Sequence, residues 1–524
     1  MRFYFLLVLF FVFSITVSAQ SNKVLTLNLR VYDHITHLQN RGLLLELDPT
    51  SLPYTTGEVY EALLKVEEET LSEVEAVWYN SVKKIVSPKS KGVEEKALVI
   101  NASIEGGFNV KNTNRLNLLR PEDQNLYFSP ISAAKFYLEG GSFGGQFNLR
   151  QDETYFIDPD GVNPFGRFHT RAEDFYFGYQ AEYLKIYFGR YRNHWGVYGQ
   201  SSTILSSNPF SYDNINFRFG NNRLNIEGIF GELDNLSENG DFDPFTGGRE
   251  AQINGTRRYL AAHKINWSPN NRLRLSLFRT ALYSSNTSSI SLKYLNPFND
   301  LLFDRTNNPN NHFNNTFIGG SLWLNKGRFT MNGQITLDDI HLTNNDERMT
   351  ASVIGMMNFS ELFYNTDLAI KLEVISYQSY NTSTQISGRY LYMGRGIATQ
   401  FNDYVLASVH TEHFAYNLLN GLRIKPELTL LLQGEQEIDQ PFYEIEPDGS
   451  LPPFVLTGTV EQTLRGALNL SFNPIPEFWL EGEFGINDVQ NKNNIENNDV
   501  LELTGMLIAG FRLSLTKILN NESK

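Results

Sequence analysis

The sequence predicts an all-β transmembrane fold: an antiparallel outer-membrane β-barrel of about 18 strands, preceded by a small N-terminal periplasmic α-helical bundle. Three observations support this fold class. The chain starts with an apolar segment typical of secreted proteins, and its residues alternate with a period of two from about residue 97 onward. It also holds 38 Phe and 26 Tyr but only 5 Trp, and barrels place aromatic girdles at both membrane interfaces.

Residues 1–19 have the features of a secretory signal peptide. Arg2 supplies a positive charge, an apolar run follows from Phe3 to Phe13, and positions 17–19 carry a small-residue cleavage motif, so we expect cleavage after Ala19. The apolar run is too short to span a bilayer, and no later stretch is long and apolar enough for a spanning helix. We therefore expect a protein of a Gram-negative outer membrane, with a periplasmic N-terminal region and extracellular loops.

Residues 20–96 predict two or three short helices on the periplasmic side. Apolar residues fall at helical spacing from Tyr32 to Leu38, and Gly42 can end that helix. Residues 55–58 (TTGE) have the form of a capping box, and residues 70–73 (TLSE) repeat it. The next helix is amphipathic, and Pro88 is expected to close it. Its apolar positions are Leu71, Val74, Trp78, Val82 and Ile85.

Residues 97–524 predict the barrel itself. In the stretch 184–188, Leu184, Ile186 and Phe188 share one face, whereas Lys185 and Tyr187 share the other. The stretch 478–486 repeats this pattern with Glu481 and Glu483 on the polar face. A soluble β-sandwich would alternate in the same way, but a single sandwich rarely grows to such a length. Lipid outside and a polar lumen inside therefore explain the alternation best.

The connections between the predicted strands are of two kinds. Residues 268–271 and 325–327 form tight turns, whereas 237–257, 304–315 and 490–499 are long and polar. Short turns at one end and long loops at the other are typical of the periplasmic and extracellular ends of a barrel. One strand with its connection takes roughly 23 residues, which predicts about 18 strands. The last strand is expected to end near Leu515, before a polar tail, where many barrels finish on an aromatic residue.

The composition excludes several functions. The formal net charge of −14 argues against nucleic acid as a partner. The absence of cysteine excludes thiolate metal sites and a cysteine nucleophile. We expect no cofactor, no metal and no catalytic residues.

One segment resembles a known family. Residues 189–200 read GRYRNHWGVYGQ and are followed by SSTILSSNPF at 201–210. This resembles the capsule assembly protein Wzi family, in which a Gly-Arg strand end precedes Trp-Gly-x-x-Gly and a serine- and leucine-rich run into Ser-Asn and Pro-Phe. Further matches lie at 38–44, 257–263 (RRYLAAH), 294–298 (YLNPF) and 337–339 (LDD), so that the resemblance spans about residues 30–515. The motif positions are Gly189, Gly196, Gly199, Pro209, Phe210, His263, Asn296, Pro297, Asp338 and Asp339.

This resemblance implies a surface lectin that holds capsular or exopolysaccharide on the cell without catalysis. The partners would be surface polysaccharide, outer-membrane lipids and lipopolysaccharide, and the barrel-assembly machinery during biogenesis. We expect a monomer. Some relatives in gliding bacteria are linked to motility adhesins, so a surface-adhesion role stays open, as does a porin-like channel for oligosaccharides.

The candidate polysaccharide-binding residues lie in the matching segment. Sugars are held by aromatic faces and by planar groups that form paired hydrogen bonds, and this segment concentrates both. The alternative is that Trp195 and Tyr198 belong to an aromatic girdle beside a tight glycine bend. The candidates are Arg190, Arg192, His194, Trp195, Tyr198, Gln200 and Asn208.

Other clusters have plainer explanations. Asp338 and Asp339 are adjacent, so their side chains point to opposite faces of a strand. Glu481 and Glu483 share a face, and a solvated lumen wall explains them better than a Ca²⁺ site or a glycosidase pair.

Two further clusters invite a functional interpretation. The loop with Asp241, Asp243 and Glu250 could hold Ca²⁺, although its spacing is not that of an EF-hand. His194 with Ser201 or Ser206 could form a hydrolase pair, but neither serine has a nucleophile-elbow sequence around it.

Overall fold

The computed structural model describes residues 21–27, 30–87, 98–160, 170–234, 257–285, 291–298, 314–338, 350–382, 386–440, 442 and 452–519. The predicted signal peptide lies outside these residues. So do Asp339 and the acidic loop residues Asp241, Asp243 and Glu250.

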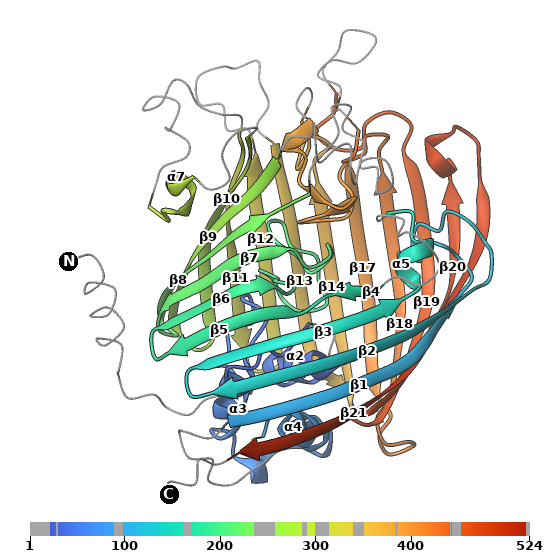
Figure 1. Ribbon diagram of the computed structural model, residues 1–524. Helices are drawn as coiled ribbons and strands as arrows, with labels where there is room; N and C mark the ends of the chain where they lie inside the picture. Colours follow the sequence, from blue (N-terminus) through green and yellow to red (C-terminus); the bar gives the residue numbers. More distant parts are fainter. Residues whose placement is uncertain are drawn as a thin grey trace, which may run out of the picture.

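The described strands form one closed antiparallel barrel of eighteen strands (Figure 1). Each strand pairs with its neighbours in chain order, and β1 closes the ring by pairing with β21 from Leu98↔Leu519 to Lys111↔Met506. The short β4 and β5 both pair with β3 and therefore share one position in the ring. The strands are β1 (Leu98–Lys111), β2 (Tyr127–Gly140), β3 (Phe143–Asp152), β4 (Thr170–Ala172), β5 (Phe175–Ala181), β6 (Leu184–Arg190), β7 (Asp213–Gly220), β8 (Leu224–Glu232), β9 (Arg257–Asn270), β10 (Leu273–Ser285), β11 (Asn314–Lys326), β12 (Phe329–Asp338), β13 (Thr350–Phe363), β14 (Thr366–Ile375), β17 (Tyr404–Phe414), β18 (Leu422–Gln433), β19 (Glu461–Ile475), β20 (Phe478–Gln490) and β21 (Val500–Leu519).

The outer face of the barrel wall is largely apolar, whereas its inner face carries polar side chains together with apolar ones that pack on the lumenal segments. On β9, Ile265 and Trp267 are exposed outward, whereas Lys264 and Asn266, which alternate with them, are buried in the lumen. This order is the reverse of a soluble β-protein and is that of a transmembrane barrel. Among the described helices, none is long and apolar enough to cross a membrane.

The connections at one end of the barrel are tight, as predicted, whereas most of the predicted long loops at 237–257 and 304–315 lie outside the described residues. The turns at 271–272 and 327–328 are tight and lie at the end that carries the helices (Figure 1). At that end, Gly327 has a φ of +70°, which glycine adopts without strain. The prediction for the last strand was wrong, because β21 continues to Leu519 and residues 516–519 pair with the first residues of β1.

In the part of the chain before the barrel that the structure describes, there are three α-helices: α2 (Val31–Asn40), α3 (Thr56–Leu63) and α4 (Glu73–Val86). The predicted capping box at Thr55 and Glu58 is present. The second box is formed by Ser72 and Glu75, not from Thr70, because Thr70 ends a 3₁₀ turn, η1 (Glu68–Thr70). The helices bury Tyr32, Ile35, Leu38, Val74, Trp78 and Val82 in one core with Phe414 of the barrel wall.

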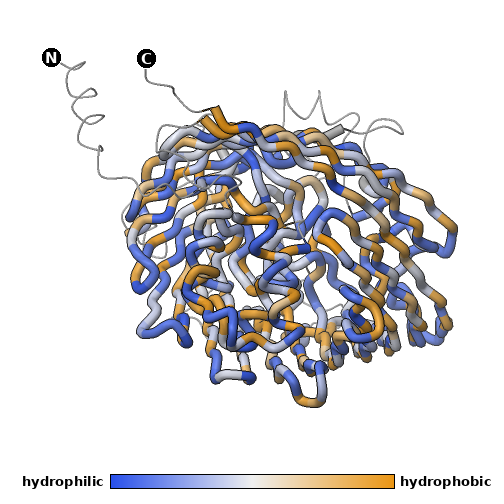
Figure 2. Tube along the Cα trace, turned by 90° about the horizontal axis from the view of Figure 1, so that it is seen from below, coloured by the Kyte–Doolittle hydropathy of each residue, from blue (hydrophilic) through white to orange (hydrophobic). Residues whose placement is uncertain are grey.

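The interior of the barrel is occupied from both ends. Figure 2 looks at the barrel from below and shows chain segments crossing the area within the ring of strands. The helices lie at one end. From the other end, residues 191–212 and the described residues of the connection 376–403 (376–382 and 386–403) fold into the lumen. The second connection holds the 3₁₀ turn η2 (Ile386–Gly388) and a small hairpin of β15 (Leu391–Tyr392) and β16 (Arg395–Gly396). Other short helical turns, α5 (Thr154–Ile157), α7 (Leu292–Leu295) and η3 (Lys492–Asn494), lie in other connections.

Candidate functional site

The segment 191–212, which connects β6 to β7, runs through the lumen and reaches the helical region. His194 and Leu52 form an antiparallel bridge, in which the His194 N–H donates to the Leu52 carbonyl at 3.0 Å and the Leu52 N–H donates back at 2.9 Å. Further along, the ring of Tyr198 stacks on that of Tyr32 in α2, with the two ring centroids 5.1 Å apart. This connection therefore links the helices at one end of the barrel to the strand ends at the other end.

The second half of this segment is held by the connection 376–403. The Tyr380 hydroxyl donates to the Thr203 carbonyl at 2.7 Å, and the Tyr390 hydroxyl donates to the Ile204 carbonyl at 2.8 Å. The Ser206 N–H donates to the Ile397 carbonyl at 2.8 Å. Because both tyrosines are fully buried, these bonds fix the two connections as one packed body inside the lumen.

Polar residues of the barrel wall bind this body from the side. On β12, Gln334 donates from Nε2 to the Trp195 carbonyl at 2.6 Å and accepts at Oε1 from the Thr203 N–H at 2.9 Å. On β9, the Lys264 ammonium donates to the Thr50 carbonyl at 2.6 Å and lies 5.8 Å from the Trp195 ring centroid. These lumenal side chains complete the backbone hydrogen bonds of segments that have no regular secondary structure.

Ion pairs seat the helices in their end of the barrel. The Arg41 side chain is fully buried, and its Nη atoms lie 2.7 Å from Glu361 Oε1 and 3.0 Å from Asp367 Oδ1. On the opposite side of the barrel, Glu58 pairs with Lys185 of β6. Burial alone would raise the pKa of the Glu58 carboxyl, but Lys185 and Arg218 outweigh burial and hold this pKa at about 2.

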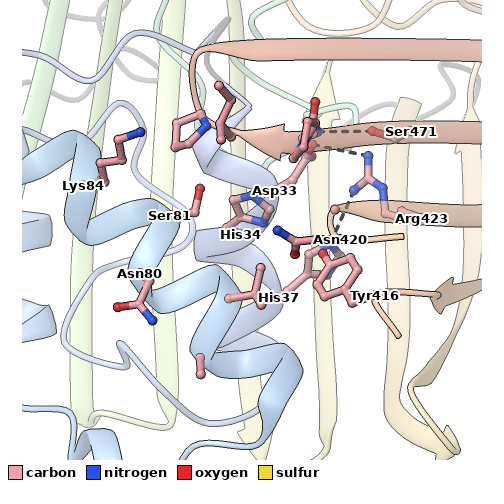
Figure 3. Close-up of a pocket in the computed structure, with 17 residues that line it drawn as sticks. Asp33, His34, His37, Asn80, Ser81, Lys84, Tyr416, Asn420, Arg423 and Ser471 are labelled. Atoms are coloured by element: carbon pink, nitrogen blue, oxygen red, sulfur yellow. Dashed lines mark hydrogen bonds and ion pairs between the residues drawn. The ribbon is translucent and has the colours of Figure 1, made fainter. Parts of the chain in front are cut away.

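A pocket of about 350 Å³ lies between α2, α4 and the adjacent strand ends (Figure 3). The charged side chains that line it are paired: Arg423 lies 3.4 Å from Asp33, which also lines the pocket, and 3.0 Å from Glu412, whereas Lys84 lies 2.8 Å from Glu477. Burial lowers the pKa of His34 to about 4, so this imidazole is neutral at pH 7. A second pocket of about 660 Å³ lies at the same end, beside α3. Among the described residues, no group of three or more His, Asp or Glu could hold a metal ion.

The structure separates the residues that we singled out as sugar ligands. Arg190 lies at the strand end away from the helices, with its Nε 3.0 Å from Asp213 Oδ1, and Arg192 lies 3.6 Å from Glu173. Both are partly exposed. His194 and Trp195 are each only 2% exposed and lie inside the lumen. This placement favours a packing role for these two residues, whereas the sugar-binding role of the segment stays a prediction.

Three further members of this set make protein contacts. Tyr198 stacks on α2, the Gln200 amide lies against the sulfur of Met356, and the Asn208 amide donates to the Gly396 carbonyl at 2.9 Å and to Gln400 Oε1 at 2.7 Å. The girdle alternative for Trp195 and Tyr198 is wrong, since both face the interior and not the lipid.

The family-motif residues fall into two places. Gly189, Gly196, Gly199, Pro209 and Phe210 lie along the lumenal connection or at its entrance. Gly189 has a φ of +129°, and an added Cβ would lie 2.2 Å from the Phe175 carbonyl oxygen, so the strand end requires glycine.

The remaining motif residues lie elsewhere in the barrel. His263 lies on the outside of the wall, where its ring lies 3.4 Å from the carbonyl of Leu295, the residue before Asn296 and Pro297. Asp338 ends β12 and is buried.

The described side chains do not form the pairs that a hydrolase or a glycosidase would need. Both ring nitrogens of His194 are engaged by backbone groups, Nδ1 by the Ser207 N–H at 3.2 Å and Nε2 by the Val197 carbonyl at 3.1 Å. The Ser206 hydroxyl donates to the Ile397 carbonyl. Glu481 pairs with Arg30, and Glu483 pairs with Arg465. These carboxylates are therefore ion-paired parts of the inner wall.

Sequence reasoning missed the residues that organise the interior. Arg258 and Lys264 of β9 point inward, and the Arg258 guanidinium donates to the Ser387 and Leu391 carbonyls at 3.1 and 3.0 Å. A signal was present, because both residues fall on the lumenal face of β9, which alternates with the outward-facing Ile265 and Trp267. Long cationic side chains at such positions indicate backbone carbonyls in the lumen.

The comparisons with known proteins show a similarity in fold only. No protein-family model matches the chain, and no curated protein matches it either. Among solved structures, the chain is similar to Wzi of Escherichia coli, an outer-membrane protein involved in group 1 capsule assembly that is a carbohydrate-binding β-barrel, with a TM-score of 0.61 and 12% identity. The match covers 94% of this chain and 99% of Wzi. OpdK and OprD of Pseudomonas aeruginosa follow at TM-scores of 0.45 and 0.44 and at 11% and 8% identity, covering 81% and 82% of this chain and 100% and 97% of theirs. The chain therefore has a Wzi-like barrel fold.

Proposed function

We propose that this chain is an outer-membrane protein that binds capsular or exopolysaccharide and helps to retain it at the cell surface, without catalysis. The observation that carries the proposal is the packed interior. A barrel whose lumen holds helices at one end and two interlocked connections at the other is suited to binding at its rim rather than to passage of solutes. The fold it shares with a carbohydrate-binding barrel adds support.

The rim at the end away from the helices is the surface that would meet the polysaccharide, and we assign this end to the cell exterior. Arg190, the last residue of β6, and Arg192, near the start of the 191–212 segment, are both partly exposed at this end, and each lies beside a carboxylate. A guanidinium next to a carboxylate offers both donors and acceptors to the vicinal hydroxyls of a sugar. The buried part of the segment would then act as the support of these side chains.

Gene deletion tests the cellular role. The polysaccharide bound to cells and the polysaccharide released into the medium are measured in parent and deletion strains. We expect the released fraction to rise in the deletion strain and to return to the parental level on complementation. An unchanged partition between the two fractions would overturn the proposed function.

A double variant tests the assigned rim. Arg190→Ala with Arg192→Ala should weaken polysaccharide binding by the folded barrel. Arg328→Ala is a matched control, because Arg328 is also an exposed arginine paired with a carboxylate, Glu361, but lies at the helical end. Equal loss of binding in both variants, or none in either, would rule out this rim position.

The channel alternative makes the opposite prediction for conductance. In planar bilayers, the packed interior predicts no steady open pore, since buried hydrogen bonds join the two connections that occupy the lumen. A stable ohmic conductance of the native barrel would favour the porin-like function.

A further inference from the structure

One loop segment lies on the outside of the barrel. The residues 291–298, which include the short helix α7, lie beside the upper parts of β8, β9 and β10 (Figure 1). Tyr294 of α7 stacks on Tyr283 of β10 with their ring centroids 4.1 Å apart, and Tyr283 stacks in turn on Tyr259 at 5.3 Å. These wall residues face outward, because the residues that alternate with them on β9 and β10, such as Arg258 and Leu282, are buried in the lumen.

This segment covers a polar break in the apolar wall. His263 and Arg279 are paired across β9 and β10, and both face outward. The Arg279 guanidinium donates to the Asn296 carbonyl at 2.8 Å, and the His263 ring lies 3.4 Å from the Leu295 carbonyl. Imidazole and guanidinium groups that face hydrocarbon need such partners, since lipid supplies none.

The polar pair lies at the level of lipid-facing apolar residues, because Arg279 pairs with Ile318 of β11, which faces outward and is exposed. Toward the helical end, the next outward residue on β10 is Leu277, which is 70% exposed. On β9 the next outward residues are Ile265 and Trp267, which are also exposed. The residues that cover His263 and Arg279 must therefore reach the level at which the wall meets lipid.

The outer surface of the segment is itself apolar. Leu292 is 79% exposed and Phe298 is 74% exposed. The Lys293 ammonium lies 4.6 Å from the Tyr294 ring centroid, and a lysine stem of this kind can extend toward lipid headgroups while its apolar part stays buried. Apolar anchors beside a cation, continuous with the lipid-facing wall, form an interfacial membrane element.

We propose that residues 291–298 form a lipid anchor, which docks on the outer wall through Tyr294 and inserts Leu292 and Phe298 among the acyl chains of the outer leaflet. The proposal rests on the outer-membrane location of the barrel but not on polysaccharide binding. The motif residues His263 and Asn296 thereby gain a shared role, because the wall and the covering segment satisfy each other's polar groups.

Single labelled cysteines test the anchor directly, since the chain has no cysteine of its own. Leu292→Cys and Phe298→Cys carry a nitroxide, and the barrel is refolded into phospholipid vesicles. Accessibility to oxygen, which concentrates in lipid, is compared with accessibility to a water-soluble nickel chelate. Leu277→Cys gives the lipid reference, and Ile495→Cys, an exposed apolar residue in the connection between β20 and β21, gives the matched water reference.

We expect the ratio of oxygen to nickel accessibility at 292 and 298 to rise to that at 277. A ratio equal to that at 495 would place the segment in water and overturn the proposal. Protection from both reagents would indicate a second protein chain on this surface and would overturn it as well. Polysaccharide binding is measured on the same samples, so failure of the anchor and failure of the proposed function are separate results.

A docking variant completes the test. Tyr294→Ala removes the ring that stacks on Tyr283, whereas Tyr294→Phe keeps the ring and removes only its hydroxyl. With the label at 292, Ala should shift the accessibility ratio toward the water reference, and Phe should leave it unchanged. An unchanged ratio in the Ala variant would mean that stacking on the wall does not hold the anchor.

Discussion

Removal of the Arg41 guanidinium should loosen the helical region from the barrel. Arg41 follows α2, and its buried side chain joins Glu361 and Asp367 at the end of the hairpin of β13 and β14. It also lies 3.8 Å from Glu75 of α4 and stacks 4.6 Å from the Trp78 ring. The substitution Arg41→Met keeps the apolar contact with Trp78 and removes the charge.

The magnitude follows from the burial of the groups left behind. Breaking a buried ion pair by removing one partner costs about 3–5 kcal/mol, because the other charge stays buried without compensation. Glu361 retains Arg328, so the loss falls mainly on Asp367 and Glu75, and we expect the lower end, about 3 kcal/mol. If α2 and α4 detach as a unit, this destabilisation speeds their amide exchange roughly 150-fold.

Hydrogen exchange of α2 and α4 in the refolded barrel measures this effect. Arg30→Met is the matched control, because Arg30 also pairs with a barrel carboxylate, Glu481 at 2.7 Å, but is about one-third exposed. An exposed pair contributes about 0–1 kcal/mol, so exchange should change little in this control. Equal exchange in the Arg41→Met variant and the native protein would refute the role of the buried pair.

Four further predictions concern pH and packing. Burial lowers the pKa of His34 to about 4, so as pH falls the imidazole is protonated in the undocked helices before it is protonated in the docked ones. Docking of the helices should therefore weaken as pH falls from 6.5 toward 4. His34→Gln should flatten the dependence of amide exchange on pH in this range. The pKa of Glu58 is held at about 2, so a second loss should follow below pH 4.5, which exchange measured at pH 3 would reveal. Gly189→Ala should lower the free energy of unfolding in urea more than Gly199→Ala, which meets no atom within 4 Å and costs only about 1–2 kcal/mol of backbone strain; the reverse order would be inconsistent with the Gly189 geometry. Trp195→Ala should cost about 3–5 kcal/mol in the same assay, and a loss below 1 kcal/mol would mean that Trp195 is not packed in the lumen.

The barrel could be predicted because its signals are local. Alternation on each strand is set by which face meets lipid, and the capping box at Thr55 is set by hydrogen bonds between residues three apart. The end of β21 was misjudged for the same reason. Nothing in residues 516–519 alone indicates a strand, and their pairing depends on β1, which lies some 400 residues earlier in the chain.

The location of the 191–212 segment, on the surface or packed in the lumen, could not be predicted from its own residues. Arginine, tryptophan and tyrosine in one loop suit a sugar site on the surface and a packed lumen equally well. The choice is made by distant partners: Leu52 pairs with His194, Tyr380 holds Thr203, and Lys264 lies beside Trp195. Only the inward lysines and arginines of the strands gave a sign that chain segments fill the lumen.

Binding of purified surface polysaccharide from the same cells to the barrel in lipid nanodiscs tests the central claim most directly. The proposed function predicts saturable binding that is lost in the Arg190→Ala, Arg192→Ala double variant and kept in Arg328→Ala. A folded native barrel that shows no binding at any polysaccharide concentration would contradict it.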